Sequence, residues 1–292
     1  MRARNLLPWL LLAGFAAGLA AQNTPKVWTL QELFHRNVGT RDQQEKQFPP
    51  HHIIGNIYYV GTETLASFLV TTPQGNILIN TTYERTVPVL LSSVEKLGFR
   101  FSDIKIVLGS HAHADHMQGD ALVKELTGAR VMAMEQDVPA LRAMTPEGKP
   151  HPIDQILHDG EEVTLGGTTL VAHLTPGHTR GDTTWSMKAR EGGKTYDVVI
   201  IGSMGVNPGY KLVNNPDISG IAEEYERGFR VLHSLACDVP LGSHPAMYNM
   251  TEKYARIGKG PNPFIDPEGY KRELDIEETA FRTTLQQQQS AH

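Results

Sequence analysis

The chain has 292 residues, of which 27 are basic and 32 acidic, and its formal net charge is −5 at pH 7. No basic run or patch is present, which excludes the usual electrostatic signature of a nucleic-acid-binding protein. A single cysteine, Cys237, rules out an intramolecular disulfide and is most simply a small buried hydrophobe. The length suits one large α/β domain or two smaller ones, and no linker favours two.

The first 21 residues have the composition of a secretory signal peptide. Two arginines form a basic start, residues 6–19 are apolar, and Ala20 and Ala21 precede the polar Gln22. The alternative is a membrane anchor, but the apolar run is shorter than the ~20 residues that a spanning helix needs, and Pro8 interrupts it. We therefore expect cleavage after Ala20 or Ala21, a mature domain over residues 22–292, a periplasmic location and no membrane contact after cleavage.

Short apolar segments separated by turns predict a chain rich in strands. In the first half, we expect strands at 57–60, 66–71, 77–79, 104–108 and 130–134, a hairpin turn at 73–76, and helices at 87–97, 117–126 and 138–144. In the second half, we expect strands at 162–165, 168–174, 183–189 and 197–201, and helices at 220–235 and 267–286. Segment 145–158 is expected as a loop beside a substrate cleft, and the polar run 286–289 as a fraying end. Two β-rich halves with helices on the outside predict an α/β fold, a four-layer αβ/βα sandwich.

Four side chains of metal-ligand type lie within six residues, His111, His113, Asp115 and His116. Imidazole nitrogens and carboxylate oxygens suit Zn²⁺. Spacing at i and i+2 does not place side chains on one face of a helix, so a loop is predicted. The cluster follows the expected strand 104–108, and the end of a strand is where α/β folds place their sites. The alternative, histidines that cap a helix or pack in the core, would crowd four such side chains together for no energetic gain.

Two further histidines follow expected strands. A Pro-Gly turn precedes His178, and Gly-Ser precedes His244, so both imidazoles can point into a cleft. Each alone is weak evidence, but beside the cluster both become candidates for the remaining ligands of a dizinc site. The other histidines are interpreted as surface or structural residues, namely His35, His51, His52, His151, His158, His173, His233 and His292.

With these residues, the chain resembles the metallo-β-lactamase superfamily over roughly residues 53–281. Glyoxalase II, lactonases and related members carry a bridging aspartate after the late strand, and first-subclass lactamases carry a cysteine ligand there. This chain has Ser203 at that place. Serine there, together with Asp115 and His116, is similar to the third subclass of the class B β-lactamases, subclass B3. Segments 207–210 and 263–267 also resemble that subclass.

The resemblance implies a ligand set for two Zn²⁺ ions per chain. His111, His113 and His178 would bind the first zinc ion, and the second would be bound by Asp115, His116 and His244. Three protein ligands per metal leave open positions, which is a catalytic arrangement. Asp115 is also the candidate catalytic residue.

The resemblance further implies two substrate-binding residues. Ser203 would bind the substrate carboxylate, and Tyr210 would donate to the carbonyl oxygen. The alternatives are a turn hydroxyl bonded to its own backbone for Ser203 and simple packing for Tyr210.

The implied activity is a metallo-β-lactamase that hydrolyses penicillins, cephalosporins and carbapenems and so confers antibiotic resistance. Two zinc ions about 3.5–4 Å apart lower the pKa of a shared water towards ~7, and the resulting hydroxide would attack the β-lactam carbonyl. The small-molecule β-lactam is the expected partner, and a monomer the expected state. The alternatives are a dizinc hydrolase of lactones or thioesters and a non-catalytic zinc-binding protein.

Three positions depart from the family pattern. Asn80 stands where an aspartate usually supports the metals, and such a change costs ~10–100-fold in affinity or activity, which predicts a weakly held second zinc. Gly205 replaces a hydroxyl residue that often helps to bind substrate. Asp182 adds a carboxylate near His178 where a small neutral residue is common, either to orient an imidazole or to face water.

Overall fold

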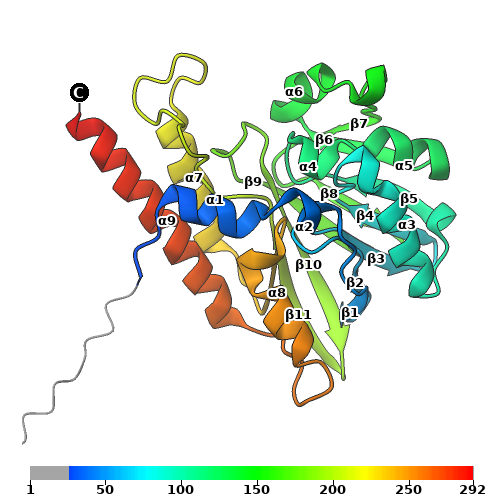
Figure 1. Ribbon diagram of the computed structural model, residues 1–292. Coiled ribbons are helices and arrows are strands. Elements are labelled where there is room, and N and C mark those ends of the chain that lie inside the picture. Colours follow the sequence, from blue (N-terminus) through cyan, green and yellow to red (C-terminus); the bar gives the residue numbers. More distant parts are fainter. Residues whose placement is uncertain (1–25, 292) are drawn as a thin grey trace, which may run out of the picture.

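The computed structural model describes residues 26–291, so the predicted signal peptide lies outside the described residues. Two β-sheets stand between two groups of helices (Figure 1). Over the part of the chain that the structure describes, no helix has the length and apolarity that a membrane span requires.

The first sheet has seven strands in chain order. They are β1 (His51–Ile54), β2 (Ile57–Tyr59), β3 (Phe68–Thr72), β4 (Gly75–Ile79), β5 (Ile104–Leu108), β6 (Arg130–Met134) and β7 (Gln155–Leu157). Strands β1 to β4 pair antiparallel, and the pairs from β4 to β7 are parallel. Because successive side chains alternate between faces, Phe68 and Val70 enter the core between the sheets, whereas Leu69 packs with the outer helices α3 (Val87–Lys96) and α5 (Asp120–Thr127).

The second sheet has five strands in the order β12-β11-β10-β9-β8. They are β8 (Glu162–Leu165), β9 (Thr168–Leu174), β10 (Thr183–Glu191), β11 (Lys194–Ile201) and β12 (Val239–Gly242). Only β11 and β12 pair parallel in this sheet. Helices α7 (Ile221–Ser234) and α9 (Pro267–Ser290) lie on the side away from the first sheet (Figure 1), where Phe281 packs on Tyr225 and Phe229. The four-layer αβ/βα sandwich is therefore confirmed.

Short helices complete the chain. They are α1 (Leu30–Val38), α2 (Arg41–Glu45), α4 (Ala114–Met117), α6 (Val138–Ala143) and α8 (Met250–Ala255). A capping box at Thr29 and Glu32 begins α1. This helix is joined to α9 by ion pairs from Arg36 to Glu273 and Glu277, so the first and last helices of the described residues lie together.

Four predicted strands have the observed bounds, β5, β6, β8 and β9, but three predictions were wrong. The helix expected at 117–126 is divided into α4 and α5 at Gly119. The backbone nitrogen of Gly119 donates to the carbonyl oxygen of Thr82, and a Cβ atom at this position would lie only 2.7 Å from the carbonyl oxygen of Thr81. Segment 145–158 is not all loop, because β7 pairs with β6 there. The polar run 286–289 does not fray: the helix continues to Ser290, and Gln288 bonds to the backbone of Tyr210 and Leu212.

Candidate metal centre

The predicted ligand side chains come from both sheets. His111 to His116 follow β5 of the first sheet, His178 lies in the turn between β9 and β10, and His244 follows β12 of the second sheet. All six are brought together in two groups of three, and each group places its ligand atoms within 4.8 Å of one another.

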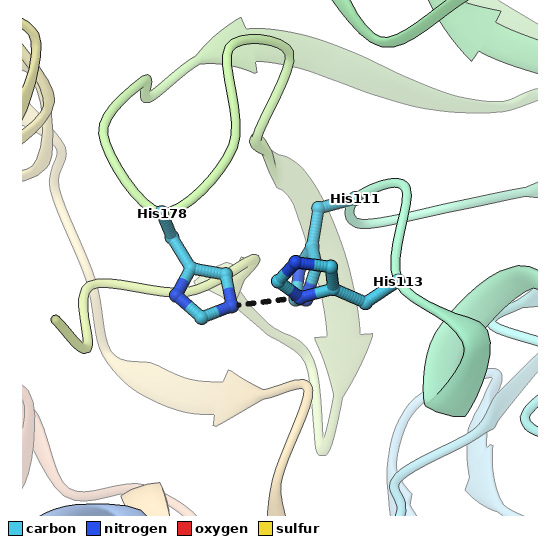
Figure 2. A group of neighbouring side chains, drawn as sticks. All are labelled: His111, His113 and His178. Atoms are coloured by element: carbon cyan, nitrogen blue, oxygen red, sulfur yellow. Dashed lines mark hydrogen bonds between the residues drawn. The ribbon is translucent and has the colours of Figure 1, made fainter. Parts of the chain in front are cut away.

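The first group is His111, His113 and His178, whose rings face one another (Figure 2). His178 Nε2 lies 3.1 Å from His113 Nδ1. On its other side, His178 Nδ1 lies 2.6 Å from the carbonyl oxygen of Gly205. A proton on Nδ1 satisfies that carbonyl and leaves the Nε2 lone pair for a metal. Burial and the neighbouring His113 lower the pKa of His178 to about 3, so its ring is neutral near pH 7.

The second group is Asp115, His116 and His244. Asp115 Oδ2 lies 3.3 Å from His116 Nε2 and 3.8 Å from His244 Nε2. His244 Nδ1 lies 3.0 Å from the carbonyl oxygen of Thr64, which fixes this ring as Gly205 fixes His178. Burial lowers the pKa of His116 to about 3, although the Asp115 carboxylate opposes this shift. The ring centroids of His111 and His116 are 4.2 Å apart, so the two groups of ligands are in contact.

The residues present fit bound metal. His111 Nε2 and His116 Nε2 are buried, and neither has a hydrogen-bond partner within residues 26–291. Buried polar atoms are normally paired, and a metal ion on these nitrogens would supply what is missing. Three nitrogens in one group, and two nitrogens with one carboxylate in the other, suit Zn²⁺ with open coordination positions.

The prediction that all the cluster side chains lie on a loop was wrong for two of them. His113 is extended and precedes α4, whose first turn contains Asp115 and His116. Adjacent residues of a helix do not share a face, but the ligand atoms of Asp115 and His116 still lie within 4.8 Å of each other. The i and i+2 argument therefore applies only to His111 and His113.

Two buried carboxylates surround the first group. Asp182 Oδ1 lies 3.1 Å from His111 Nδ1, so this carboxylate faces an imidazole rather than water. Its pKa is raised well above the usual value by burial, which hydrogen bonds from Thr175 and Ser203 oppose. Asp137, which was not among the predicted site residues, accepts from the backbone of Ala112 at 2.8 Å and of Gly181 at 2.7 Å. Asp137 thus joins the His111 and His178 segments. Its only sequence signal is a carboxylate shortly after the end of β6.

Asn80 supports the start of the ligand segment. Its Oδ1 accepts from the backbone nitrogen of Ser110 at 2.9 Å and from the hydroxyl of Ser110 at 3.0 Å. Its Nδ2 is buried, with no partner among the residues that the structure covers. Asn80 therefore acts beside His111, next to the first group.

The predicted substrate residues lie on the segment after β11. Ser203 is 9% exposed, and its backbone nitrogen donates to Asp182 Oδ2 at 3.1 Å. Tyr210 is partly buried against the core. Gly205 lacks the expected hydroxyl, but its carbonyl accepts from both His178 and the hydroxyl of Tyr225. The backbone of this segment thus contributes to the candidate metal centre, which no residue-type pattern reveals.

The comparisons with known proteins agree with this geometry. A family model of the metallo-β-lactamase superfamily matches residues 60–204. The structure is similar to native FEZ-1 metallo-β-lactamase from Legionella gormanii, with 49% identity, a TM-score of 0.81, and coverage of 84% of this chain and 98% of that one. It is also similar to BJP-1, a subclass B3 metallo-β-lactamase of Bradyrhizobium japonicum, with 36% identity, a TM-score of 0.79, and coverage of 85% and 98%.

A curated relative has a different name. Hydroxyacylglutathione hydrolase of Fuscovulum blasticum is 34% identical over 92 residues, which is 32% of this chain. The chain spans about a third of the length of this relative, 31%. The solved structures, in contrast, match over almost their whole length and at higher identity. The chain therefore belongs to the metallo-β-lactamase superfamily and, within it, to subclass B3.

Proposed function

We propose that the protein is a dizinc β-lactamase that opens the amide bond of penicillins, cephalosporins and carbapenems. The observation that carries this proposal is the pair of contiguous three-ligand groups, with Ser203 rather than a carboxylate on the segment after β11. Under the proposal, His111, His113 and His178 hold one zinc ion, and Asp115, His116 and His244 hold the other. The 49% identity to an enzyme named a metallo-β-lactamase supports it.

Zinc ions held there would supply Lewis acidity and lower the pKa of a water towards neutrality. The residues of the chain perform the remaining tasks. Backbone carbonyls of Gly205 and Thr64 hold the Nδ1 protons of His178 and His244, so both rings keep the tautomer that binds metal. Asp115, within reach of His116 and His244, orients the attacking water and accepts its proton.

The substrate is held by the segment after β11. Ser203 binds the carboxylate of the β-lactam, and Tyr210 donates to its carbonyl oxygen. Ser203 is anchored through its backbone nitrogen to Asp182, which leaves its side chain free for a ligand.

The proposal extends to the setting of the enzyme. Residues 1–21 would direct export, and residues 22–292 would act in the periplasm as a monomer. Hydrolysis of β-lactams there would confer antibiotic resistance.

The test is hydrolysis of a carbapenem by purified residues 22–292, with and without a chelator, together with a zinc count. We expect turnover that the chelator abolishes and about two zinc ions per chain. Bound zinc without turnover of a penicillin, a cephalosporin or a carbapenem would overturn the β-lactamase proposal.

A second candidate is a hydrolase of thioesters or lactones. The similarity of residues within this chain to hydroxyacylglutathione hydrolases favours it. A hydroxyacylglutathione thioester and a lactone, assayed beside the three β-lactams, separate the candidates. The enzyme class with the larger kcat/KM on the same preparation is the better supported one.

A further inference from the structure

Asp182 lies at the start of β10 and is fully buried. We propose that it is a positioning residue that fixes the His111 ring for metal binding and ties that ring to the backbone of Ser203. The inference rests on the metal site of the proposed function, and it holds whichever substrate the enzyme uses.

The two oxygens of Asp182 face different partners. Oδ2 accepts from the Thr175 hydroxyl at 2.9 Å and from the Ser203 backbone nitrogen at 3.1 Å. Oδ1 lies 3.1 Å from His111 Nδ1. Because a backbone N–H can only donate, Oδ2 must be an acceptor. Oδ1 and His111 Nδ1 are both buried, and neither has a hydrogen-bond partner among residues 26–291, so each atom faces the other as its available partner.

This contact selects the tautomer of His111. A proton on Nδ1, directed at Asp182 Oδ1 3.1 Å away, leaves the lone pair on the buried Nε2 for a metal ion. His178 and His244 obtain the same tautomer from backbone carbonyls, whereas His111 relies on a carboxylate. A carboxylate partner fixes the orientation of a ligating imidazole and raises its basicity.

The surrounding backbone leaves space for this carboxylate. At Gly202, a Cβ atom would lie 2.5 Å from Asp182 Oδ2 and 2.6 Å from the carbonyl oxygen of Thr183. Only glycine at position 202 therefore allows the chain end of β11 to approach Asp182. The same carboxylate thus holds a metal-binding ring on one side and the substrate-binding segment on the other.

The test compares Asp182→Asn with Thr175→Val in the otherwise unchanged mature chain. An amide has one acceptor and one donor group, so it cannot accept from both Ser203 and His111. We expect Asp182→Asn to raise the Kd of the more tightly held zinc ion ~10–100-fold, measured by competition with a chromophoric chelator. Thr175→Val removes one bond to Oδ2 but keeps Oδ1 at His111, and its zinc affinity should stay at the wild-type value.

A stability measurement separates positioning from folding. Thermal midpoints are measured with excess zinc and with excess chelator. The zinc-dependent increment is the midpoint with zinc minus the midpoint with chelator. If Asp182 positions His111, its variants have a smaller increment than the wild type. If Asp182 is purely structural, its variants have a lower midpoint in chelator and an unchanged increment. Asp182→Ser removes the carboxylate without adding an amide donor, and it should show the same loss of zinc affinity. It replaces Asp182→Asn in the test if the asparagine variant does not fold.

Wild-type zinc affinity in both Asp182 variants would overturn the inference, and so would a loss confined to the midpoint in chelator. The result is independent of the β-lactamase assay. If the wild-type chain binds zinc but hydrolyses no β-lactam, the proposed function fails while the zinc measurements still decide the role of Asp182. If the wild-type chain binds no zinc, both fail.

Discussion

His51 lies between the rings of Tyr59 and Phe264, at centroid distances of 5.3 and 5.6 Å, and its Nε2 is buried without a partner in the described part of the chain. Burial lowers the pKa of His51 to about 4. In the unfolded chain, this imidazole takes up its proton near pH 6.5. Above that pH, the ring is neutral in both states. As the pH falls from 6.5 towards 4, only the unfolded chain gains the proton, so folding stability is lost.

We expect His51→Phe to remove this loss. The free energy of unfolding of the wild type should fall relative to that of the variant by up to about 1.4 kcal/mol per pH unit between pH 6.5 and pH 4. Urea unfolding of both proteins in chelator, at pH 7.5, 5.5 and 4.5, measures the difference. The other histidines cancel because both proteins contain them, and pH 7.5 provides the reference. A difference that does not change with pH would contradict the buried neutral ring.

Ser203→Ala tests the proposed substrate contact. A hydrogen bond to a charged group contributes about 1.5–3 kcal/mol, so kcat/KM for a carbapenem should fall by about 10–100-fold, chiefly through KM. Zinc content should stay at the wild-type value because the backbone bond to Asp182 remains. Unchanged hydrolysis kinetics would eliminate this role for Ser203.

Some residues of the candidate site could be predicted from the sequence, and others could not. The candidate ligands were identifiable because four of them are close in the chain and two follow strand ends. Asp137 and the carbonyl of Thr64 were not, because they reach the site only through contacts with Ala112, Gly181 and His244 that are distant in sequence. The effect of Asn80 on the second zinc stays a prediction, since its contacts here are with Ser110.

The contact between helices α1 and α9 buries one arginine and two glutamate side chains. Arg36 bonds to Glu273 and lies 3.1 Å from Glu277, and the glutamate side chains are 7% and 1% exposed. Burial raises the pKa of Glu273 to about 8 and also raises that of Glu277, while the guanidinium of Arg36 opposes both shifts. One cation thus compensates two carboxyl groups.

Arg36→Met should therefore be strongly destabilising. Removal of one partner of a buried ion pair costs about 3–5 kcal/mol. Without Arg36, the pKa values of both buried glutamates rise further in the folded chain. Folding stability is lost as the pH rises through a raised carboxyl pKa, so the free energy that the variant loses relative to the wild type should grow from pH 5 to pH 9. Urea unfolding at both pH values measures it. Arg41→Met is the control, since the pair of Arg41 with Glu45 is 78% and 39% exposed and its removal should leave the free energy of unfolding almost unchanged. Equal losses in both variants would show that the buried pair has no special role.

Elements were predictable where the pattern is local. The alternation in β9 and the apolar run of β5 give their bounds directly. Strand β7 has three residues and an exposed Ile156, so it owes its existence to pairing with β6 rather than to its own composition. The division between α4 and α5 depends on contacts of Gly119 with the backbone of Thr81 and Thr82. Such contacts between distant residues cannot be predicted from the spacing of apolar residues within the helix.

In the whole molecule, the candidate metal centre lies where the two sheets meet. The first sheet provides His111 to His116, and the second provides His178 and His244. Bound zinc would therefore connect the two halves, and its binding energy would add to the stability of the folded chain.

Chelation should lower the thermal midpoint, and added zinc should restore it. A site with free zinc at 100 times its Kd contributes about 2.7 kcal/mol. His244→Ala removes a ligand of the second group and should lose part of this increment. His233→Ala is the control, because this partly exposed side chain pairs with Glu278 away from the ligand groups. A midpoint that does not respond to chelator in the wild type would contradict a zinc-linked pair of sheets.

Gln288, in the last turn of α9, holds the backbone of Tyr210 and Leu212, and Arg36 of α1 reaches the same helix. A ribosome makes the chain from its amino end, so α1 and the segment that carries Tyr210 are complete long before their common support exists. The segment that carries Tyr210 thus acquires its final framework only as the last turn of α9 is synthesised. A protease that removed the last turn of α9 would spare every candidate metal ligand and still release the segment that carries Tyr210.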